Sequence, residues 1–161
     1  MLNLKTESYL KSIFIICFVS IITAFFIEYI LGHQPCNLCL IERIPYILSI
    51  IIIMVVFLIK KNQKFLVMLL TLTFIFSFAI SFYHFGIEQG FFQESSICGV
   101  KTSTEIITKE DLLKQLSEKT ISCRDVTFRI FGLSLTSINI VISLLFIITL
   151  LKIFKKYEKN K

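Results

Sequence analysis

The chain has 161 residues, of which 55% are hydrophobic and only 17% are charged, and its mean hydropathy is +0.81. Soluble domains are usually about 45–50% apolar and about 25% charged, so this composition excludes an ordinary soluble domain. The net charge of +6 does not indicate nucleic-acid binding, because the lysines gather in a few short segments that flank apolar runs.

Four long apolar runs follow one another along the chain. They cover residues 12–31, 40–59, 65–85 and 133–151. At about 1.5 Å per helical residue, each run is long enough to cross a hydrocarbon core of roughly 30 Å. The first run is longer than the apolar part of a signal peptide and no small-residue cleavage motif follows it, so we expect it to be retained.

The connections between these runs predict how the helices are arranged. Residues 60–64 (KKNQK) form a short turn, so the second and third runs should be antiparallel neighbours. The sequence therefore predicts an all-α membrane protein, a four-helix transmembrane bundle with up-down-up-down topology. We expect a single membrane domain over residues 1–161, with outer loops at residues 32–39 and 86–132.

The charged residues predict the orientation of this bundle. With four crossings, both termini and the 60–64 turn share one side, which carries ten lysines and two acidic residues, a net charge of +8. The other side carries seven basic and nine acidic residues, a net charge of −2. Because basic flanking segments stay in the cytoplasm, we expect cytoplasmic termini and outer loops across the membrane.

One segment of the long outer loop has a helical pattern. Thr108 is a suitable N-cap, and Leu112, Leu113 and Leu116 then share one face while lysines and glutamates occupy the other. Residues 107–117 are therefore predicted to form a short amphipathic helix. The pattern fits a helix on the outer membrane surface and equally one that covers the top of the bundle.

Four of the five cysteines fall in the outer loops, where disulfides persist. Cys36 and Cys39 form a C-x-x-C motif in the first outer loop, and Cys98 and Cys123 lie in the second. Cys17 lies within the first span and is expected to be a small buried residue. The even number outside predicts two disulfides, with three possible connectivities.

The C-x-x-C spacing favours redox chemistry over a structural role. A disulfide that closes so small a ring restricts little unfolded-chain entropy, and the spacing is typical of redox-active dithiols. A structural staple remains an alternative for Cys98 and Cys123. Zinc is the other alternative, but structural zinc usually takes two closely spaced ligand pairs, and these two cysteines are 25 positions apart.

Arg43 follows Cys39 by four residues, so both lie on one helix face if the second helix begins near Cys39. A cation and a helix N-terminus each favour the thiolate, which is the reactive form of cysteine. Pro45 fits such a start, because proline is tolerated in the first helical turn. We therefore expect Arg43 to serve the site; anchoring at the interface or pairing with a nearby acid is the alternative.

Three further polar residues have simple explanations. His33 is expected at the interface, and Asn139 is expected to form a helix–helix hydrogen bond. Glu28 lies near the outer end of the first span and should reach the interface, although an ionisable residue in a span is a functional candidate by default.

Three segments of the chain resemble the DsbB family, the inner-membrane thiol–quinone oxidoreductases also called disulfide bond formation protein B. They are FIEYILGHQPCNLCLIERIPY at residues 26–46, YHFGIE at 83–88 and FGLSLTSIN at 131–139. The similarity runs from the first span to the last. Its most specific parts are the P-C-x-x-C-x-x-x-R motif and the second cysteine pair in the long outer loop.

The resemblance implies an electron path through two cysteine pairs. Cys98 and Cys123 would form the disulfide that oxidises a DsbA-like thioredoxin-fold periplasmic protein, with Cys98 in the mixed disulfide. Cys36 and Cys39 would receive the electrons by internal exchange, with Cys36 linking to Cys123. The implied location is the bacterial inner membrane, with the cysteines on the periplasmic side.

The same resemblance implies a quinone, ubiquinone or menaquinone, as the electron acceptor, and no metal. Cys39 would face the quinone, Arg43 would sit beside its ring and His84 would lie near the same pocket. The chain departs from the family in having no tryptophan, which leaves the quinone type open.

Two other functions compete with this interpretation. A vitamin K epoxide reductase-like bundle would also use a C-x-x-C, but in that family the motif comes late in the chain and in this sequence it opens the second span. A non-enzymatic four-span protein with disulfide-stapled loops is the second. A redox pair should yield to mild reductants that leave a staple intact.

Overall fold

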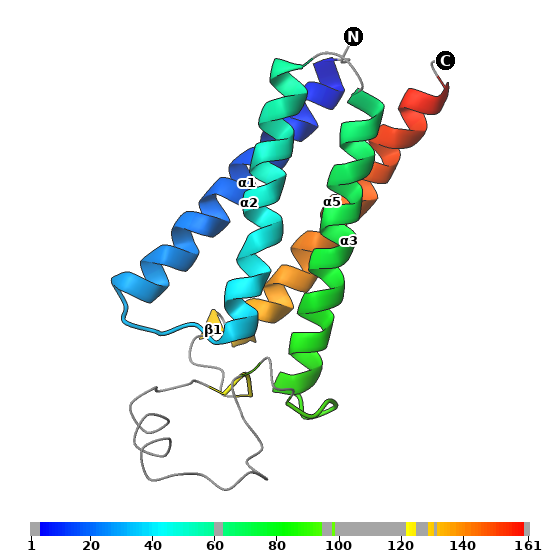
Figure 1. The fold of residues 1–161 in the computed structure, drawn as a ribbon. Coiled ribbons are helices and arrows are strands. Elements are labelled where there is room, and N and C mark those ends of the chain that lie inside the picture. The colour runs from blue at the N-terminus through cyan, green and yellow to red at the C-terminus, as the bar shows by residue number, and fades with distance from the viewer. Residues whose placement is uncertain are drawn as a thin grey trace, which may run out of the picture.

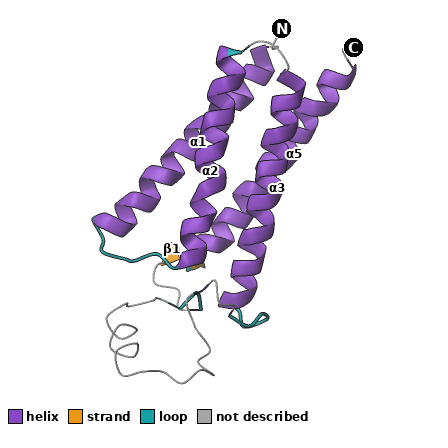
Figure 2. Cartoon of the chain, in the orientation of Figure 1, coloured by secondary structure: helices purple, strands orange, loops and turns teal. Residues whose placement is uncertain are grey.

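The computed structural model describes residues 4–59, 63–94, 98, 122–124, 129–130 and 132–159. Its elements, in chain order, are α1 (Leu4–Tyr29), α2 (Asn37–Leu58), α3 (Gln63–Glu88), β1 (Arg129–Ile130), β2 (Leu133–Ser134) and α5 (Leu135–Lys159) (Figures 1 and 2). All four helices are long and apolar enough to cross a membrane, so the predicted fold class is confirmed. The amphipathic helix predicted at residues 107–117 lies outside the described residues.

The helices extend beyond the apolar runs that predicted them. The first begins at Leu4 and ends at Tyr29, and the third continues to Glu88. The second begins at Asn37 because Cys36 caps it, so Pro45 lies inside α2 and not in its first turn. The helix begins near Cys39 as expected, but the expectation that Pro45 lies in its first turn is wrong, since apolar runs locate lipid-crossing segments and not helix caps.

Helices that follow one another in the chain pack as neighbours. α1 packs against α2, α2 against α3 and, most extensively, α3 against α5. The start of α1 and the end of α5 lie at one end of the bundle, and the cysteine-bearing segments lie at the other (Figure 1). This is the arrangement that four antiparallel crossings require.

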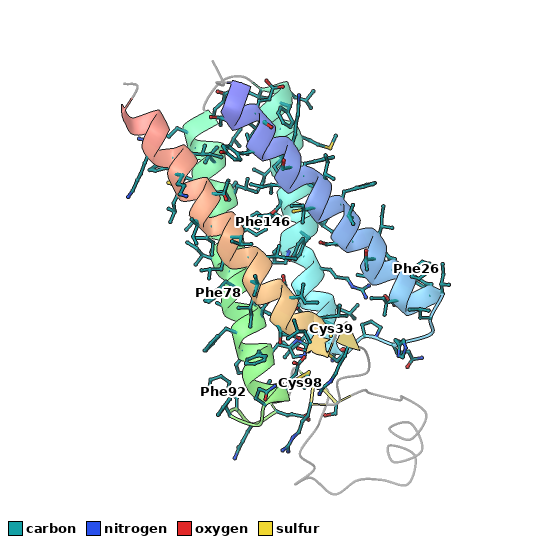
Figure 3. All side chains as sticks on the ribbon, turned by 180° about the vertical axis from the view of Figure 1, so that it is seen from behind. Phe26, Cys39, Phe78, Phe92, Cys98 and Phe146 are labelled. Carbon is teal, nitrogen blue, oxygen red and sulfur yellow. A yellow bond between two sulfur atoms is a disulfide. The ribbon has the colours of Figure 1, made fainter. Side chains whose placement is uncertain are left out.

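The middle of the bundle is filled by aromatic and aliphatic side chains. Phe74 is fully buried and meets the rings of Tyr46 and Phe146 edge-on, at centroid distances of 6.3 Å and 4.8 Å. Phe146 points between the helices, whereas Phe26 points away from them (Figure 3) and is 48% exposed. Large apolar side chains on the outside of the bundle are what lipid contact requires.

The cysteine end of the bundle is closed by two turns. β1 and β2 pair antiparallel directly before α5, and the Ser137 backbone N–H donates to the Ser134 hydroxyl, which caps α5. After α3, the backbone N–H groups of Phe91 and Phe92 donate to the carbonyl of Gly86. The chain can reverse there because Gly90 adopts a positive φ of 78°.

Gly86 gives a stability prediction, because the Phe92 ring packs directly on its Cα. A Cβ at this position would lie 2.1 Å from Phe92 Cδ2, and the Phe92 ring also stacks on Tyr83. We expect Gly86→Ala to destabilise the fold by about 1–3 kcal/mol through overpacking, seen as a lower midpoint of thermal denaturation in detergent. In a Phe92→Ala background the same substitution should cost much less; an equal loss in both backgrounds would show that this contact is not the cause.

Candidate functional site

The N-terminus of α2 positions the C-x-x-C pair. Cys36 is the N-cap, in extended conformation, and its sulfur accepts a hydrogen bond from the Cys39 backbone N–H at 3.4 Å. A cysteine in this position uses its sulfur as serine or aspartate would use oxygen, and the helix dipole favours negative charge on it. The two sulfur atoms are hydrogen-bonded at 2.9 Å, so the spacing of three residues places them in contact.

The surroundings of Cys36 favour its thiolate. The hydrogen bond with the Cys39 side chain is the largest influence, and with a smaller contribution from His84 it lowers the pKa of the Cys36 thiol from 9.0 to about 4, against the opposing effect of burial. His84 Nε2 lies 3.6 Å from the Cys36 sulfur. The i, i+4 spacing of Cys39 and Arg43 predicts an activated sulfur at Cys39, whereas the structure gives the thiolate-stabilising contacts to Cys36.

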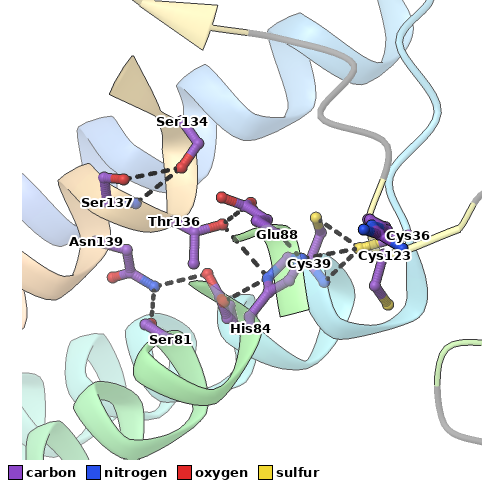
Figure 4. A network of polar contacts seen from close by, with 12 residues as sticks. Cys36, Cys39, Ser81, His84, Glu88, Cys123, Ser134, Thr136, Ser137 and Asn139 are labelled. Carbon is purple, nitrogen blue, oxygen red and sulfur yellow. Dashed lines mark hydrogen bonds and ion pairs between the residues drawn. The ribbon is translucent and has the colours of Figure 1, made fainter. Parts of the chain in front are cut away.

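The second cysteine pair adjoins the first. Cys98 and Cys123 form a disulfide with a Cα–Cα distance of 5.6 Å, and they are 1% and 2% exposed. They belong to the same buried cluster as Cys36, Cys39 packs against this cluster, and Figure 4 shows Cys123 beside Cys36. Two pairs that are far apart in sequence are therefore within one packed group, which is the arrangement that thiol–disulfide exchange between them needs.

A carboxylate fixes the turn that carries Cys123. Glu94, just beyond α3, accepts hydrogen bonds from the Ser122 hydroxyl and from the Arg124 backbone N–H, the second at 3.0 Å. These two partners flank Cys123 on both sides. The position of its sulfur thus depends on a residue that the sequence analysis did not single out.

A cavity of about 270 Å³ opens beside the first pair, between α1, α2 and α5. Its apolar lining includes Val19, Ile27, Ile138 and Ile142. Its polar lining includes Gln34, Cys39, Glu42, Arg43, Tyr46 and Asn139. An apolar pocket with a few polar groups at defined positions is typical of small-molecule sites.

Arg43 lines this cavity and is held there by α1. Its Nη1 donates to Glu28 Oε2 at 2.5 Å, and its guanidinium lies over the Phe25 ring, 5.2 Å from the centroid. Both interpretations of Arg43 from the sequence therefore meet in one geometry, since it pairs with an acid and also faces the cavity. Glu28, expected at the interface, orients this arginine.

His84 lies behind the cysteines. It is 2% exposed and is not among the described residues that line the cavity. Its Nδ1 lies 2.8 Å from Glu42 Oε1 and 3.4 Å from the Thr136 hydroxyl, and its Nε2 faces Cys36. The family resemblance implies that His84 lies near the pocket, and in the structure His84 contacts two residues that line it, Glu42 and Thr136.

Sequence reasoning missed most of the buried polar network that continues from His84 (Figure 4). Asn139 Nδ2 donates to Glu42 Oε2 at 2.8 Å and to Ser81 Oγ at 2.7 Å, and the Tyr46 hydroxyl donates to Asn139 Oδ1. Asn139 was expected to bridge helices, and it joins α5 to both α2 and α3. The sequence does contain an indication for Glu42, because it lies within the second apolar run and any ionisable residue in a span is a functional candidate.

The ligand atoms of Cys36, Cys39 and His84 lie within 4.8 Å of one another, a spacing that a metal ion could use. Structural zinc sites take four protein ligands, and this group of described residues supplies three. The two cysteines would also lose their ligand function on forming a disulfide. We therefore do not assign these residues as metal ligands.

The low pKa of Cys36 gives a prediction about reactivity. With Cys17, Cys98 and Cys123 replaced by alanine, the rate at which iodoacetamide alkylates Cys36 should rise with pH around a midpoint of about 4, because the thiolate is the reactive form. Removing a donor raises the pKa, so the midpoint should move upward in Cys39→Ala and by less in His84→Ala.

Cys39→Ser is the matched control, because it keeps a hydrogen-bond donor beside the Cys36 sulfur while leaving a single reactive thiol. Its midpoint should stay below that of Cys39→Ala. One common midpoint for all variants would show that neither Cys39 nor His84 stabilises the Cys36 thiolate.

Comparison with known proteins agrees with this geometry. The chain is 30% identical over 148 residues to a protein of Rickettsia prowazekii (strain Madrid E) described as uncharacterized protein RP370, covering 91% of this chain and 86% of that protein. The family model of disulfide bond formation protein DsbB matches residues 7–153, nearly the whole chain. This multi-pass membrane protein therefore belongs to the DsbB family of disulfide bond formation proteins.

Proposed function

We propose that this protein is a thiol–quinone oxidoreductase that reoxidises a DsbA-like thioredoxin-fold protein in the periplasm and passes the electrons to a membrane quinone. The observation that carries the proposal is that Cys36, Cys98 and Cys123 lie in one buried cluster and that Cys39 packs against it. Cys39 also lines the cavity between the helices. The cluster supports exchange between the pairs, and the cavity supports transfer to a small acceptor.

The electron path follows from thiol–disulfide exchange. A thiolate of the partner attacks the Cys98–Cys123 disulfide at Cys98 and frees Cys123; the partner's second thiol resolves this mixed disulfide only after Cys123 has moved to a new disulfide, and the partner then leaves oxidised. Cys123 then exchanges with the Cys36–Cys39 disulfide through a bond to Cys36. The electron pair ends on the thiols of Cys36 and Cys39, next to the cavity.

The cavity lining fits a quinone headgroup. Gln34 and Arg43 offer hydrogen-bond donors for ring carbonyl oxygens, and the aliphatic side chains of α1 and α5 suit an apolar ring and tail. A bound quinone supplies a two-electron oxidant that ends as quinol. Arg43, fixed by Glu28, orients the ring against Cys39, and Cys39 holds the thiol that is oxidised.

The proposed location is the bacterial inner membrane, with both termini in the cytoplasm. The charge difference of +8 against −2 between the two sides supports this orientation. It puts Cys36, Cys39, Cys98 and Cys123 on the periplasmic side, where a soluble thioredoxin-fold partner can meet them.

The two pairs should fail at different steps when cysteines are removed. In Cys98→Ala the partner should form no mixed disulfide, because the sulfur it attacks is absent. In Cys36→Ala the mixed disulfide between Cys98 and the partner should accumulate, because Cys123 has no second disulfide to attack. Non-reducing gels of the two variants with a reduced thioredoxin-fold donor would show this difference, and identical behaviour would refute communication between the pairs.

Arg43 should affect the quinone step alone. We expect Arg43→Met to raise the Michaelis constant for a short-chain ubiquinone by about tenfold, about 1.4 kcal/mol of binding. Arg43→Lys keeps the charge but loses the planar fork of donors, so its Michaelis constant should lie in between.

Single-turnover oxidation of the partner serves as the control, because it does not need the quinone. It should stay unchanged in both Arg43 variants. If Arg43→Met slows this single turnover and leaves the Michaelis constant unchanged, Arg43 is a structural residue.

A further inference from the structure

A chain of polar contacts connects the sulfur of Cys36 to the cavity. Cys36 Sγ lies 3.6 Å from His84 Nε2, and His84 Nδ1 lies 2.8 Å from Glu42 Oε1. Glu42 lines the cavity, whereas neither Cys36 nor His84 is among the described lining residues. The Glu42 carboxylate is therefore where this chain of contacts reaches the space in which a small molecule can bind.

The two thiols of the C-x-x-C pair differ in their access to that space. Cys39 lines the cavity and can release its proton there directly. Cys36 lies behind it, buried, with the His84 ring against its sulfur. Reduction of a quinone to a quinol takes two electrons and two protons, so the proton of Cys36 needs a carrier.

Three groups that can be anions face His84. Cys36 caps α2 and Glu42 lies near its N-terminal end, and Glu88, on α3, lies 3.9 Å from His84 Nε2. α5 contributes the neutral hydroxyl of Thr136, which donates to Glu88 Oε1 at 2.6 Å. A thiolate and a carboxylate in direct contact stabilise the imidazolium form of His84, because a buried cation needs paired anions.

Two further charged side chains among the described residues at this end of the bundle are engaged with each other. Arg43 of α2 and Glu28 of α1 pair with each other. When Cys36 enters a disulfide, its negative charge disappears. The imidazolium of His84 then loses one of its two contacting anions and becomes a proton donor.

We propose that His84 stores the proton of the Cys36 thiol and that Glu42 delivers it to the acceptor in the cavity. This inference rests on the quinone reduction proposed above. Before the step, Cys36 is a thiolate, His84 an imidazolium and Cys39 a thiol. As Cys36 and Cys39 are oxidised to a disulfide, the two electrons that they give up reduce quinone to quinol, which takes one proton from Cys39 and one from His84 through Glu42. Charge and protons balance, and the two protons that enter with the partner's dithiol reload His84 and Cys39.

Asn139 is the positioning residue of this relay. Its Nδ2 donates to Glu42 Oε2 at 2.8 Å, and Ser81 and Tyr46 fix the Asn139 amide in turn. The carboxylate is thereby held with one oxygen on His84 and the other directed toward α5. A network that only joined helices would not need an imidazole between a cysteine sulfur and a carboxylate that lines a cavity.

Glu88 provides the matched control. It is a second carboxylate near His84, one of its oxygens has no hydrogen-bond partner among the described residues, and it is not one of the described residues that line the cavity.

The full-length protein in lipid discs, reduced with dithiothreitol, would be mixed anaerobically with a short-chain ubiquinone, and quinol formation would be followed between pH 5.5 and 8.5. Single-turnover oxidation of a reduced thioredoxin-fold donor reports whether each variant is folded.

We expect Glu42→Gln to slow quinol formation by about 100-fold at pH 7, within the usual range for loss of a general acid. The remaining rate should rise as the pH falls, because solvent protons replace those from the carboxyl group. Glu88→Gln should lose less than about tenfold and keep the pH profile of the unmodified protein. Glu42→Asp should restore part of the rate, since the carboxyl group is retained.

Equal rates and pH profiles in Glu42→Gln and Glu88→Gln would overturn the relay while leaving the proposed function intact. If the unmodified protein forms no quinol, the proposed function fails and the relay with it. If Glu42→Gln does not fold, Glu42→Asp decides: a slower rate with a larger solvent deuterium isotope effect supports the relay, and no change in either overturns it.

Discussion

The hydrogen bond from the Cys39 backbone N–H to the Cys36 sulfur fixes the first turn of α2, and the site is arranged around that turn. It brings the two sulfur atoms together and directs Cys36 toward His84 on α3. It also leaves Cys39 facing the cavity. One turn further along the same helix, Glu42 and Arg43 point to different partners, the first to α3 and α5 and the second to α1. The position of this helix start thus determines which sulfur lies against His84 and which lines the cavity.

The membrane explains why so many polar groups gather at the cysteine end of the bundle. In a bundle surrounded by lipid, buried polar side chains have to satisfy one another, because no solvent is available to them. Ser77 and Ser143 do so in the middle of the bundle, at 3.2 Å, and the Asn139 network does so nearer the cysteines. These contacts join α3 to α5, the helix pair with the most extensive packing. The same contacts that hold the bundle together therefore orient the carboxylate beside His84.

The sequence was sufficient to predict the fold class and the protein family. Apolar runs of span length predicted the four helices, and the resemblance carried by the P-C-x-x-C-x-x-x-R motif agrees with the family match over residues 7–153. It was not sufficient for the helix start at Asn37 or for the interior position of Pro45, because capping by a cysteine sulfur has no strong sequence signal. Glu42 and Asn139 are 97 positions apart, and only the packing of α2 against the other helices reveals that they meet. Periodicity and spacing describe one segment at a time, whereas this network joins three.

The central claim is that electrons from a soluble dithiol leave through the C-x-x-C pair to a quinone in the membrane. The most direct measurement counts the quinol formed for each partner disulfide when the purified protein, in lipid discs without oxygen, is given a reduced thioredoxin-fold donor and a short-chain ubiquinone. The account predicts one quinol for each partner disulfide, because two electrons and two protons are transferred in each cycle. Oxidation of the partner with no quinol formed would contradict it.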